Sequence, residues 1–134
     1  MRKELNLLVV AAHSEKNKKS LLGVLHGLPI NIYSAAKIEQ AQEVLSSQPI
    51  AVIFCDGRLS DGPYRDLLSV VSSKHPATQF VVVLSPDEWS EQNDALKLGA
   101  SDVLRCPLQP TDVELVLIRA VRGELERIGL LESA

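Results

Sequence analysis

The chain has 134 residues, of which 46% are hydrophobic and 23% are charged. These values predict one globular domain with enough apolar material for a core, so neither a metal nor a disulfide is needed to hold it together. The net charge of −3 argues against direct nucleic-acid binding, and the absence of a long apolar stretch argues against a membrane span. We expect a cytoplasmic location, with Cys55 and Cys106 as reduced thiols.

The first part of the chain alternates apolar and amphipathic segments. Leu7–Val10 is a continuous apolar run and predicts a strand buried on both faces. The leucines between 21 and 28 recur at helical spacing. Pro29–Tyr33 predicts a second strand, and the apolar residues between 38 and 45 predict a second helix with Ser34 as its N-cap.

The middle of the chain repeats this alternation. Ile50–Phe54 predicts a third strand, and its lack of polar alternation again indicates burial on both faces. A helix is expected from about Pro63 to Ser73, because four apolar residues follow helical spacing there. Gln79–Leu84 predicts a fourth strand rich in valine.

The last part of the chain adds two helices around a fifth strand. The fourth helix is expected over about Ser90–Leu98, with Gly99 as its terminator. Asp102–Leu104 predicts the fifth strand. The fifth helix is expected to begin at Pro110-Thr111, where Thr111 and Glu114 match the T-x-x-E capping box, and to continue to about Leu131.

Strands that alternate with helices at this spacing indicate βαβ units and a parallel sheet. In such sheets, ligands and chemistry gather at the carboxyl ends of the strands. Five segments fall at these ends: Ala11–His13, Tyr33–Ser34, Asp56–Arg58, Ser85–Pro86 and Arg105–Pro107. A charged chemical site would normally need several carboxylates there, and these segments supply Asp56 alone.

Three stretches share an order and spacing that point to one family. Val52–Asp56 is an apolar strand that ends in aspartate, and Asp61-Gly62 follows it; Val81–Ser85 ends in a hydroxyl residue. Gly99–Leu108 is similar to a Gly-Ala-x-x-Tyr-Leu-x-Lys-Pro-Phe signature. Over roughly residues 5–122, the chain thus resembles the receiver domain of bacterial two-component response regulators.

The resemblance implies roles for two residues and one peptide bond. Asp56 falls at the phosphoacceptor position of the family, and Ser85 falls at the position that contacts the phosphoryl group. The family's Lys-Pro step corresponds to Cys106–Pro107, so we expect that peptide bond to be cis.

The chain departs from the family pattern at four positions. The acidic pair that holds Mg²⁺ in the family corresponds to Ala11 and Ala12. The family's lysine corresponds to Cys106, and its aromatic switch residue corresponds to Val103. The loop after Asp56 is also shorter than is common in the family and lacks its Met-Pro step.

These departures remove the cations that phosphoryl transfer to a carboxylate requires. Alanine supplies no ligand, so we expect Mg²⁺ binding to be weak or absent. Loss of one electrostatic stabiliser typically lowers a rate by ~10²–10³. Ordinary phosphorylation of Asp56 should therefore be abolished or very slow, unless His13, Arg58 or Arg105 supplies a compensating charge.

The sequence therefore predicts a three-layer α/β/α, flavodoxin-like domain over residues 1–122, with five parallel strands in the order 2-1-3-4-5. Residues 123–134 would extend the last helix, as a candidate linker to an output domain. We expect a receiver-like signalling module of a two-component phosphorelay, involved in signal transduction or transcriptional regulation, and not an enzyme. His13, Asp56 and Ser85 are not expected to form a hydrolytic triad, because the serine lacks the G-x-S-x-G elbow.

The expected partners are proteins: an output domain, a protein partner, or a second copy bound through the fourth helix, fifth strand and fifth helix. Trp89 is either an exposed partner-binding aromatic or a partly buried loop residue. Two alternatives stay open for the function. One is a receiver that is still phosphorylated at Asp56 through atypical metal ligands, and the other is a small-molecule or anion sensor that uses the strand-end crevice.

Overall fold

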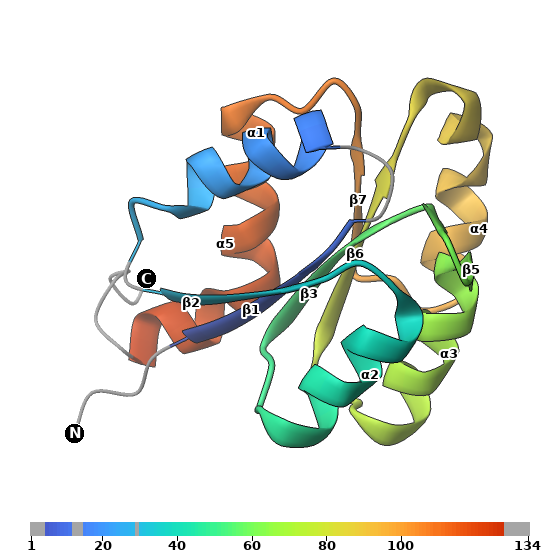
Figure 1. Cartoon of the computed structure of the whole chain (residues 1–134). Coiled ribbons are helices and arrows are strands. Elements are labelled where there is room, and N and C mark those ends of the chain that lie inside the picture. The colour runs from blue at the N-terminus through green and yellow to red at the C-terminus, as the bar shows by residue number, and fades with distance from the viewer. Residues whose placement is uncertain (1–4, 12–14, 29, 128–134) are drawn as a thin grey trace.

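A computed structural model describes residues 5–11, 15–28 and 30–127 (Figure 1). Its centre is a five-stranded sheet with the order β2-β1-β3-β6-β7, in which all neighbouring strands are parallel. The strands are β1 (Leu5–Val10), β2 (Ile30–Ala35), β3 (Val52–Asp56), β6 (Gln79–Leu84) and β7 (Asp102–Arg105). This is the flavodoxin-like order that the sequence predicts.

Helices cover both faces of the sheet. They are α1 (Glu15–Leu25), α2 (Ile38–Ser47), α3 (Tyr64–Lys74), the 3₁₀ helix η1 (Pro86–Glu91), α4 (Gln92–Lys97) and α5 (Pro110–Arg127). Figure 1 shows α1 and α5 on one face and α2, α3 and α4 on the other. The predicted three layers are confirmed, and α5 runs as one helix across residues 122 and 123.

The strands are apolar along their whole length because both of their faces are buried. On β1, Leu8 and Val10 pack with the cluster beneath α2 and α3, whereas Leu7 and Val9 pack with the cluster beneath α1 and α5. All four side chains have at most 1% of their surface exposed. This alternation explains the runs without polar residues, and it leaves the strand ends as the place for polar chemistry.

A small antiparallel ladder follows β3, which the sequence analysis did not predict. It joins β4 (Arg58–Leu59) to β5 (Gly62–Pro63). Gly62 has a φ of 150°, a backbone conformation that residues with a side chain rarely adopt. The turn directs the chain from the end of β3 into α3.

The predicted N-cap of α2 was wrong. Strand β2 continues through Ser34 to Ala35, and Lys37 is the residue at the cap position. The first N–H groups of α2 are instead accepted by Asp61, whose carboxylate lies 2.9 Å from the nitrogen of Ile38 and 3.2 Å from that of Glu39. A residue from the β4–β5 turn therefore satisfies donors that a local cap would otherwise accept.

Two helix N-termini differ in detail from the expectation. The predicted fourth helix begins later, because a 3₁₀ turn occupies Pro86–Glu91 before the short α4 begins. Helix α5 begins at Pro110 as predicted, but Thr111 therefore lies in its first turn and is not its cap. The predicted terminator is confirmed, since Gly99 follows α4 with a φ of 114°.

Cys55 and Cys106 are both buried, and neither forms a disulfide. Within the described ranges, none of the helices has the length and apolar character that a membrane crossing requires.

Candidate functional site

The carboxyl ends of β3, β6 and β7 lie level with one another. The parallel register pairs Asp56 with Val83 and pairs Leu84 with Arg105. The N–H of Cys106 donates to the carbonyl of Leu84 at 2.8 Å, which extends the alignment one residue past β7. The predicted strand-end residues therefore meet at one edge of the sheet.

Asp56 is the last residue of β3, and it is half-buried at this edge. Burial raises the pKa of Asp56 to about 7, with a further contribution from the negative charge of Glu88. Among the residues that the structure describes, no lysine or arginine forms an ion pair with Asp56. At neutral pH this carboxyl is thus close to equal parts acid and carboxylate.

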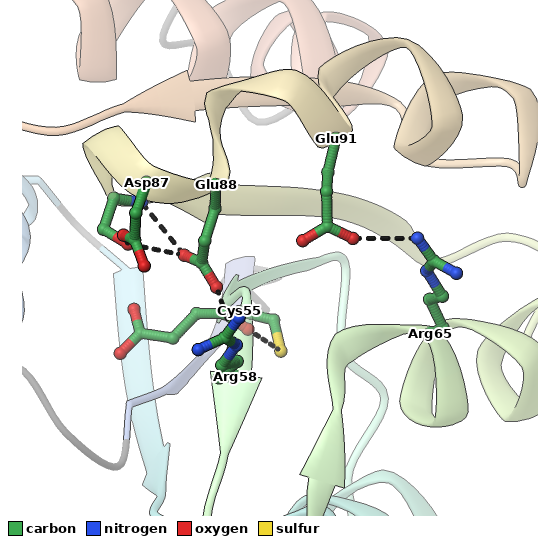
Figure 2. Close-up of polar contacts among 8 residues, drawn as sticks. Cys55, Arg58, Arg65, Asp87, Glu88 and Glu91 are labelled. Atoms are coloured by element: carbon green, nitrogen blue, oxygen red, sulfur yellow. Dashed lines mark hydrogen bonds and ion pairs between the residues drawn. The ribbon is translucent and has the colours of Figure 1, made fainter.

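The thiol of Cys55 lies in the core next to Asp56. It donates a hydrogen bond to the backbone carbonyl of Asp56 at 3.3 Å (Figure 2). Burial raises the pKa of the Cys55 thiol well above its ordinary value, and the charge of Asp56 raises it further. Cys55 is therefore a protonated, unreactive thiol of the core.

Ser85 follows β6 and makes its side-chain contacts with two acidic residues. Its Oγ lies 2.7 Å from an oxygen of Asp87 and 2.7 Å from Oε1 of Glu88. A hydroxyl has one proton to donate, so the two carboxylates share it. The hydrogen bond from Ser85 lowers the pKa of Asp87 below its ordinary value. The Ser85 hydroxyl is directed into this acidic turn.

Glu88 is the buried charged residue of the site. Its Oε1 also accepts the backbone N–H of Ser85 at 3.1 Å, while its own N–H donates to the carbonyl of Ser85 at 2.8 Å. The bond from the Ser85 N–H to the Glu88 side chain is the glutamate half of an N-terminal capping box at the start of η1, and the bond from the Glu88 N–H is the first backbone hydrogen bond of that turn. The carboxylate is therefore fixed by the turn that it caps.

The second oxygen of Glu88 is buried without a hydrogen bond among the described residues. Its nearest cation is Arg58, whose Nε lies 3.8 Å away (Figure 2). The side chain of Arg58 is 73% exposed and that of Glu88 is 6% exposed, so this long ion pair joins an exposed cation to a buried carboxylate. Such a pair compensates little of the cost of burying a carboxylate.

Gly57 lies directly beneath the carboxylate of Glu88. A Cβ atom on Gly57 would meet Oε2 of Glu88 at 2.7 Å and Oε1 at 2.8 Å. Real side chains do not approach so closely, so the glycine makes room for the carboxylate. Gly57 follows Asp56 in the chain, which places the Glu88 carboxylate between the ends of β3 and β6.

The three predicted charge partners of Asp56 have different positions. Arg58 pairs with Glu88. Arg105 donates to the side chain of Gln92 at 2.8 Å and lies 5.3 Å from the ring centre of Trp89, a cation–π contact. His13 lies outside the described residues. Among the described residues, the charge that measurably affects the pKa of Asp56 is thus the like charge of Glu88.

The positions that depart from the family pattern are apolar in the structure as well. Ala11 follows β1 and is half-buried, and Ala12 lies outside the described residues. Val103 packs against the core cluster beneath α2 and α3. Cys106 is buried, and the Cys106–Pro107 peptide bond is cis, as the resemblance implies.

The acidic residues at the end of β3 supply few of the ligands that a magnesium ion prefers. Mg²⁺ prefers a near-octahedral set of oxygen ligands that includes one or two carboxylates. In the ranges that the structure covers, no group of three or more histidine, cysteine, aspartate or glutamate side chains converges in a way that could hold a metal. The Oε1 atom of Glu88 is already bonded to Ser85.

The crevice next to Asp56 is small. A cavity of about 10 Å³ lies between the ends of β1 and β3, and Ala11, Lys18 and Asp56 are among its lining residues. That volume admits roughly one water molecule. The small side chain of Ala11 does not produce a ligand-sized pocket in this part of the site.

Sequence reasoning missed two residues of this site. Glu88 had a local signal, because Ser85-Pro86-Asp87-Glu88 matches the S-x-x-E capping pattern before a helix. Its burial beside Asp56 had none, since it depends on the packing of η1 over the end of β3. Lys18 had no signal either, because only the placement of α1 brings it to the cavity that Asp56 lines.

Two proteins of known identity resemble the chain in sequence. It is 28% identical over 109 residues to the response regulator protein PilR of Pseudomonas aeruginosa, a match that covers 81% of this chain and 24% of PilR. It is 29% identical over 84 residues to the photosynthetic apparatus regulatory protein RegA of Rhodovulum sulfidophilum, covering 63% of this chain and 46% of RegA. The matches thus span less than half the length of either relative. No protein-family model matches the chain.

Solved structures show the same fold at lower sequence identity. The signal receiver domain of an HD domain-containing protein from Pseudomonas fluorescens Pf-5 superimposes with a TM-score of 0.82 at 20% identity. The match covers 91% of this chain and 98% of that domain. At this identity the similarity concerns the fold alone.

Proposed function

Because this chain is a receiver domain of the response-regulator type, we propose that it acts as a signalling module through protein contacts, with a phosphorylation site that is degenerate. It is a module of two-component signalling and not an enzyme in its own right. Its output is a linked domain or a separate protein. The finer parts of this proposal rest on the site at the end of β3.

One observation carries the proposal: Asp56 stands in an apolar and acidic environment. Among the described residues it has no cationic partner, and burial together with Glu88 raises its pKa to about 7. A phosphoacceptor must receive a strongly negative group, which requires positive charge nearby. Ala11 and Cys106 offer none of it, and Arg58 and Arg105 make their contacts elsewhere. Lys18 lines the cavity beside Asp56 but forms no ion pair with it.

The direct test is phosphorylation with a small donor. The protein is incubated with acetyl phosphate and Mg²⁺, and its intact mass is followed for minutes to hours, with Asp56→Asn as the control. We expect no stoichiometric adduct in either protein. A rapid adduct in the natural protein that disappears in Asp56→Asn would establish the alternative, a working receiver with atypical ligands.

A rebuilt variant tests the reason for the inactivity. Ala11→Asp combined with Cys106→Lys returns a carboxylate and an amine to the positions where the family has them. If missing charge is the cause, this variant acquires a phosphoryl group faster than the natural protein. If the natural protein is already labelled at the same rate, the site is not degenerate.

The second alternative, a small-molecule sensor at the crevice, receives no support from the cavity of about 10 Å³ beside Asp56. Ligand pockets usually measure roughly 300–1,000 Å³. A groove of about 490 Å³ lies between α1 and the start of α5, and Asp56 does not line it. Thermal-shift measurements with organic metabolites would reveal a sensor that uses either place.

Exposed apolar side chains support a protein-binding surface at one part of the fold. Five large apolar side chains in the described residues are exposed, and four of them lie on η1, on α5, or on or directly after α4: Trp89, Leu96, Leu98 and Leu115. Apolar groups that gather on neighbouring elements are typical of interaction sites. We propose that partners, including a second copy of the chain, bind through α4, β7 and α5.

A further inference from the structure

We infer that the Glu88 carboxylate is an internal occupant of the site between the ends of β3 and β6, and that it keeps Ser85 and η1 in one arrangement without any modification of Asp56. The inference deepens the proposed function and rests on it, because only the family resemblance gives Asp56 and Ser85 their expected roles.

The location of the carboxylate is the first argument. A group attached to Asp56 that also touches Ser85 must lie between the ends of β3 and β6. The Glu88 carboxylate lies in that space: its Oε1 accepts both the hydroxyl and the N–H of Ser85. Both of its oxygens lie within 2.8 Å of the point where a side chain on Gly57 would begin.

The second argument is that this occupant is firmly held. Glu88 has 5% of its surface exposed, although it is charged. A carboxylate that leaves such a place gives up two hydrogen bonds to Ser85 and uncaps η1. Glu88 is thus a fixed part of the site, in contrast to the exposed Asp87, which also contacts Ser85.

The third argument is electrostatic. The Glu88 charge acts on Asp56 strongly enough to contribute to its raised pKa. A phosphoryl group on Asp56 would add more negative charge beside this carboxylate, in a partly desolvated place. Arg58 is too exposed to offset it. Glu88 therefore disfavours a phosphoryl group on Asp56, because its carboxylate already makes the contact with Ser85 that such a group would make.

The occupant is connected to the surface of the domain through its neighbour in the chain. Trp89 follows Glu88 on η1, and its ring lies 5.3 Å from the guanidinium of Arg105 on β7. Arg105 also bonds Gln92 at the start of α4. The position of Glu88 thereby fixes η1 relative to β7 and α4, which belong to the proposed partner surface.

The first experiment measures the coupling of Glu88 to Asp56. The titration of the Asp56 side-chain carboxyl is followed by ¹³C NMR in the natural protein, in Glu88→Gln and in Asp87→Asn. Glutamine keeps the shape and removes the charge, so the pKa of Asp56 should fall below about 7 but stay above its ordinary value of 3.8, because burial is the larger cause of its rise. Asp87→Asn also removes an acceptor of Ser85 but should change that pKa far less.

The second experiment measures the arrangement of η1. Trp89 is the one tryptophan of the chain, so its fluorescence reports on this turn alone. In Glu88→Ala we expect emission at longer wavelength and stronger quenching by acrylamide, because η1 loses its anchor. Asp87→Asn should resemble the natural protein. If Glu88→Ala does not fold, the nearly isosteric Glu88→Gln still provides the titration test.

Two results would overturn the inference. They are an Asp56 titration that is the same in Glu88→Gln as in the natural protein, and Trp89 quenching that is the same in a folded Glu88→Ala. Failure of the proposed function has a different signature, namely rapid phosphorylation of the natural protein at Asp56. The two failures are therefore distinguishable.

Discussion

A Cβ atom on Gly57 would lie 2.7 Å from Oε2 of Glu88. The backbone of Gly57 is held in place, since its N–H donates to the Val83 carbonyl at 3.0 Å and its own carbonyl accepts the N–H of Tyr64 at 3.1 Å. Any side chain added at Gly57 must therefore displace the Glu88 carboxylate and weaken its hydrogen bonds to Ser85.

This contact predicts that Gly57→Ala destabilises the fold. Weakening hydrogen bonds to a buried charged group costs about 1.5–3 kcal/mol, and we expect a loss in that range by urea unfolding at neutral pH. Gly23→Ala is the matched control, because no atom lies within 4 Å of its added Cβ and it lies in α1. There, alanine should raise stability by ~0.5–1 kcal/mol. Equal effects of the two substitutions would contradict this explanation.

The raised pKa of Asp56 predicts that the stability of the protein falls as the pH rises toward about 7. Its folded-state pKa of about 7 lies above the ordinary value of 3.8, so its contribution to stability is complete below the ordinary value and is lost as the pH rises through about 7. Each pKa unit corresponds to ~1.4 kcal/mol. Because the carboxyl is partly open to solvent, we expect about half of the full effect, ~2 kcal/mol.

Asp56→Asn should therefore be more stable than the natural protein at pH 8, with a smaller difference at pH 5. Urea unfolding of both proteins at several pH values measures this, since the other titrating groups cancel in the comparison. Asp87→Asn should show the opposite trend, because the pKa of Asp87 is lowered by Ser85 and its contribution is lost as the pH falls. A difference between Asp56→Asn and the natural protein that does not change with pH would exclude a raised pKa of Asp56.

The hydrogen bonds of Asp61 to the start of α2 predict that substitution of Asp61 destabilises this helix. Its carboxylate accepts the backbone N–H of Ile38, and this bond is the largest cause of its lowered pKa. The stabilisation it gives is present above the ordinary pKa of 3.8 and is lost as the pH falls further. Asp61→Ala should lower the Tm at pH 7 but have little effect near pH 2. Ser60→Ala, an exposed neighbour in the same turn, should leave the Tm unchanged.

The fold could be predicted because local signals agreed with tertiary packing. Unbroken apolar runs such as Val81–Val83 occur where a strand is covered on both faces, so the runs themselves indicated a parallel sheet. The cap of α2 could not be predicted, since Asp61 is 23 residues away from the Ile38 N–H that it accepts. The 3₁₀ turn was likewise missed, because Ser85 and Glu88 determine its start through side-chain contacts.

The candidate site was predicted in its outline but not in its electrostatics. The strand-end rule brought Asp56, Ser85 and Cys106 to the correct edge of the sheet. It could not show that the charge acting on Asp56 would be that of another acid. A glutamate in a polar turn is normally expected to be exposed, but Glu88 is buried because Gly57 leaves space for its carboxylate. That space results from the packing of η1 against the end of β3.

The proposed partner surface predicts self-association that depends on Leu98. This leucine follows α4 and is 51% exposed, and the nearby ion pair of Asp102 with Arg119 at 2.8 Å joins β7 to α5. Leu98→Lys places a charge in the surface, which should weaken a dimer at least ~10-fold, or ~1.4 kcal/mol. Leu28→Lys is the matched control, because Leu28 is also exposed but follows α1. Sedimentation equilibrium of the three proteins measures the effect, and equal dissociation constants for all three would show that any dimer uses another surface.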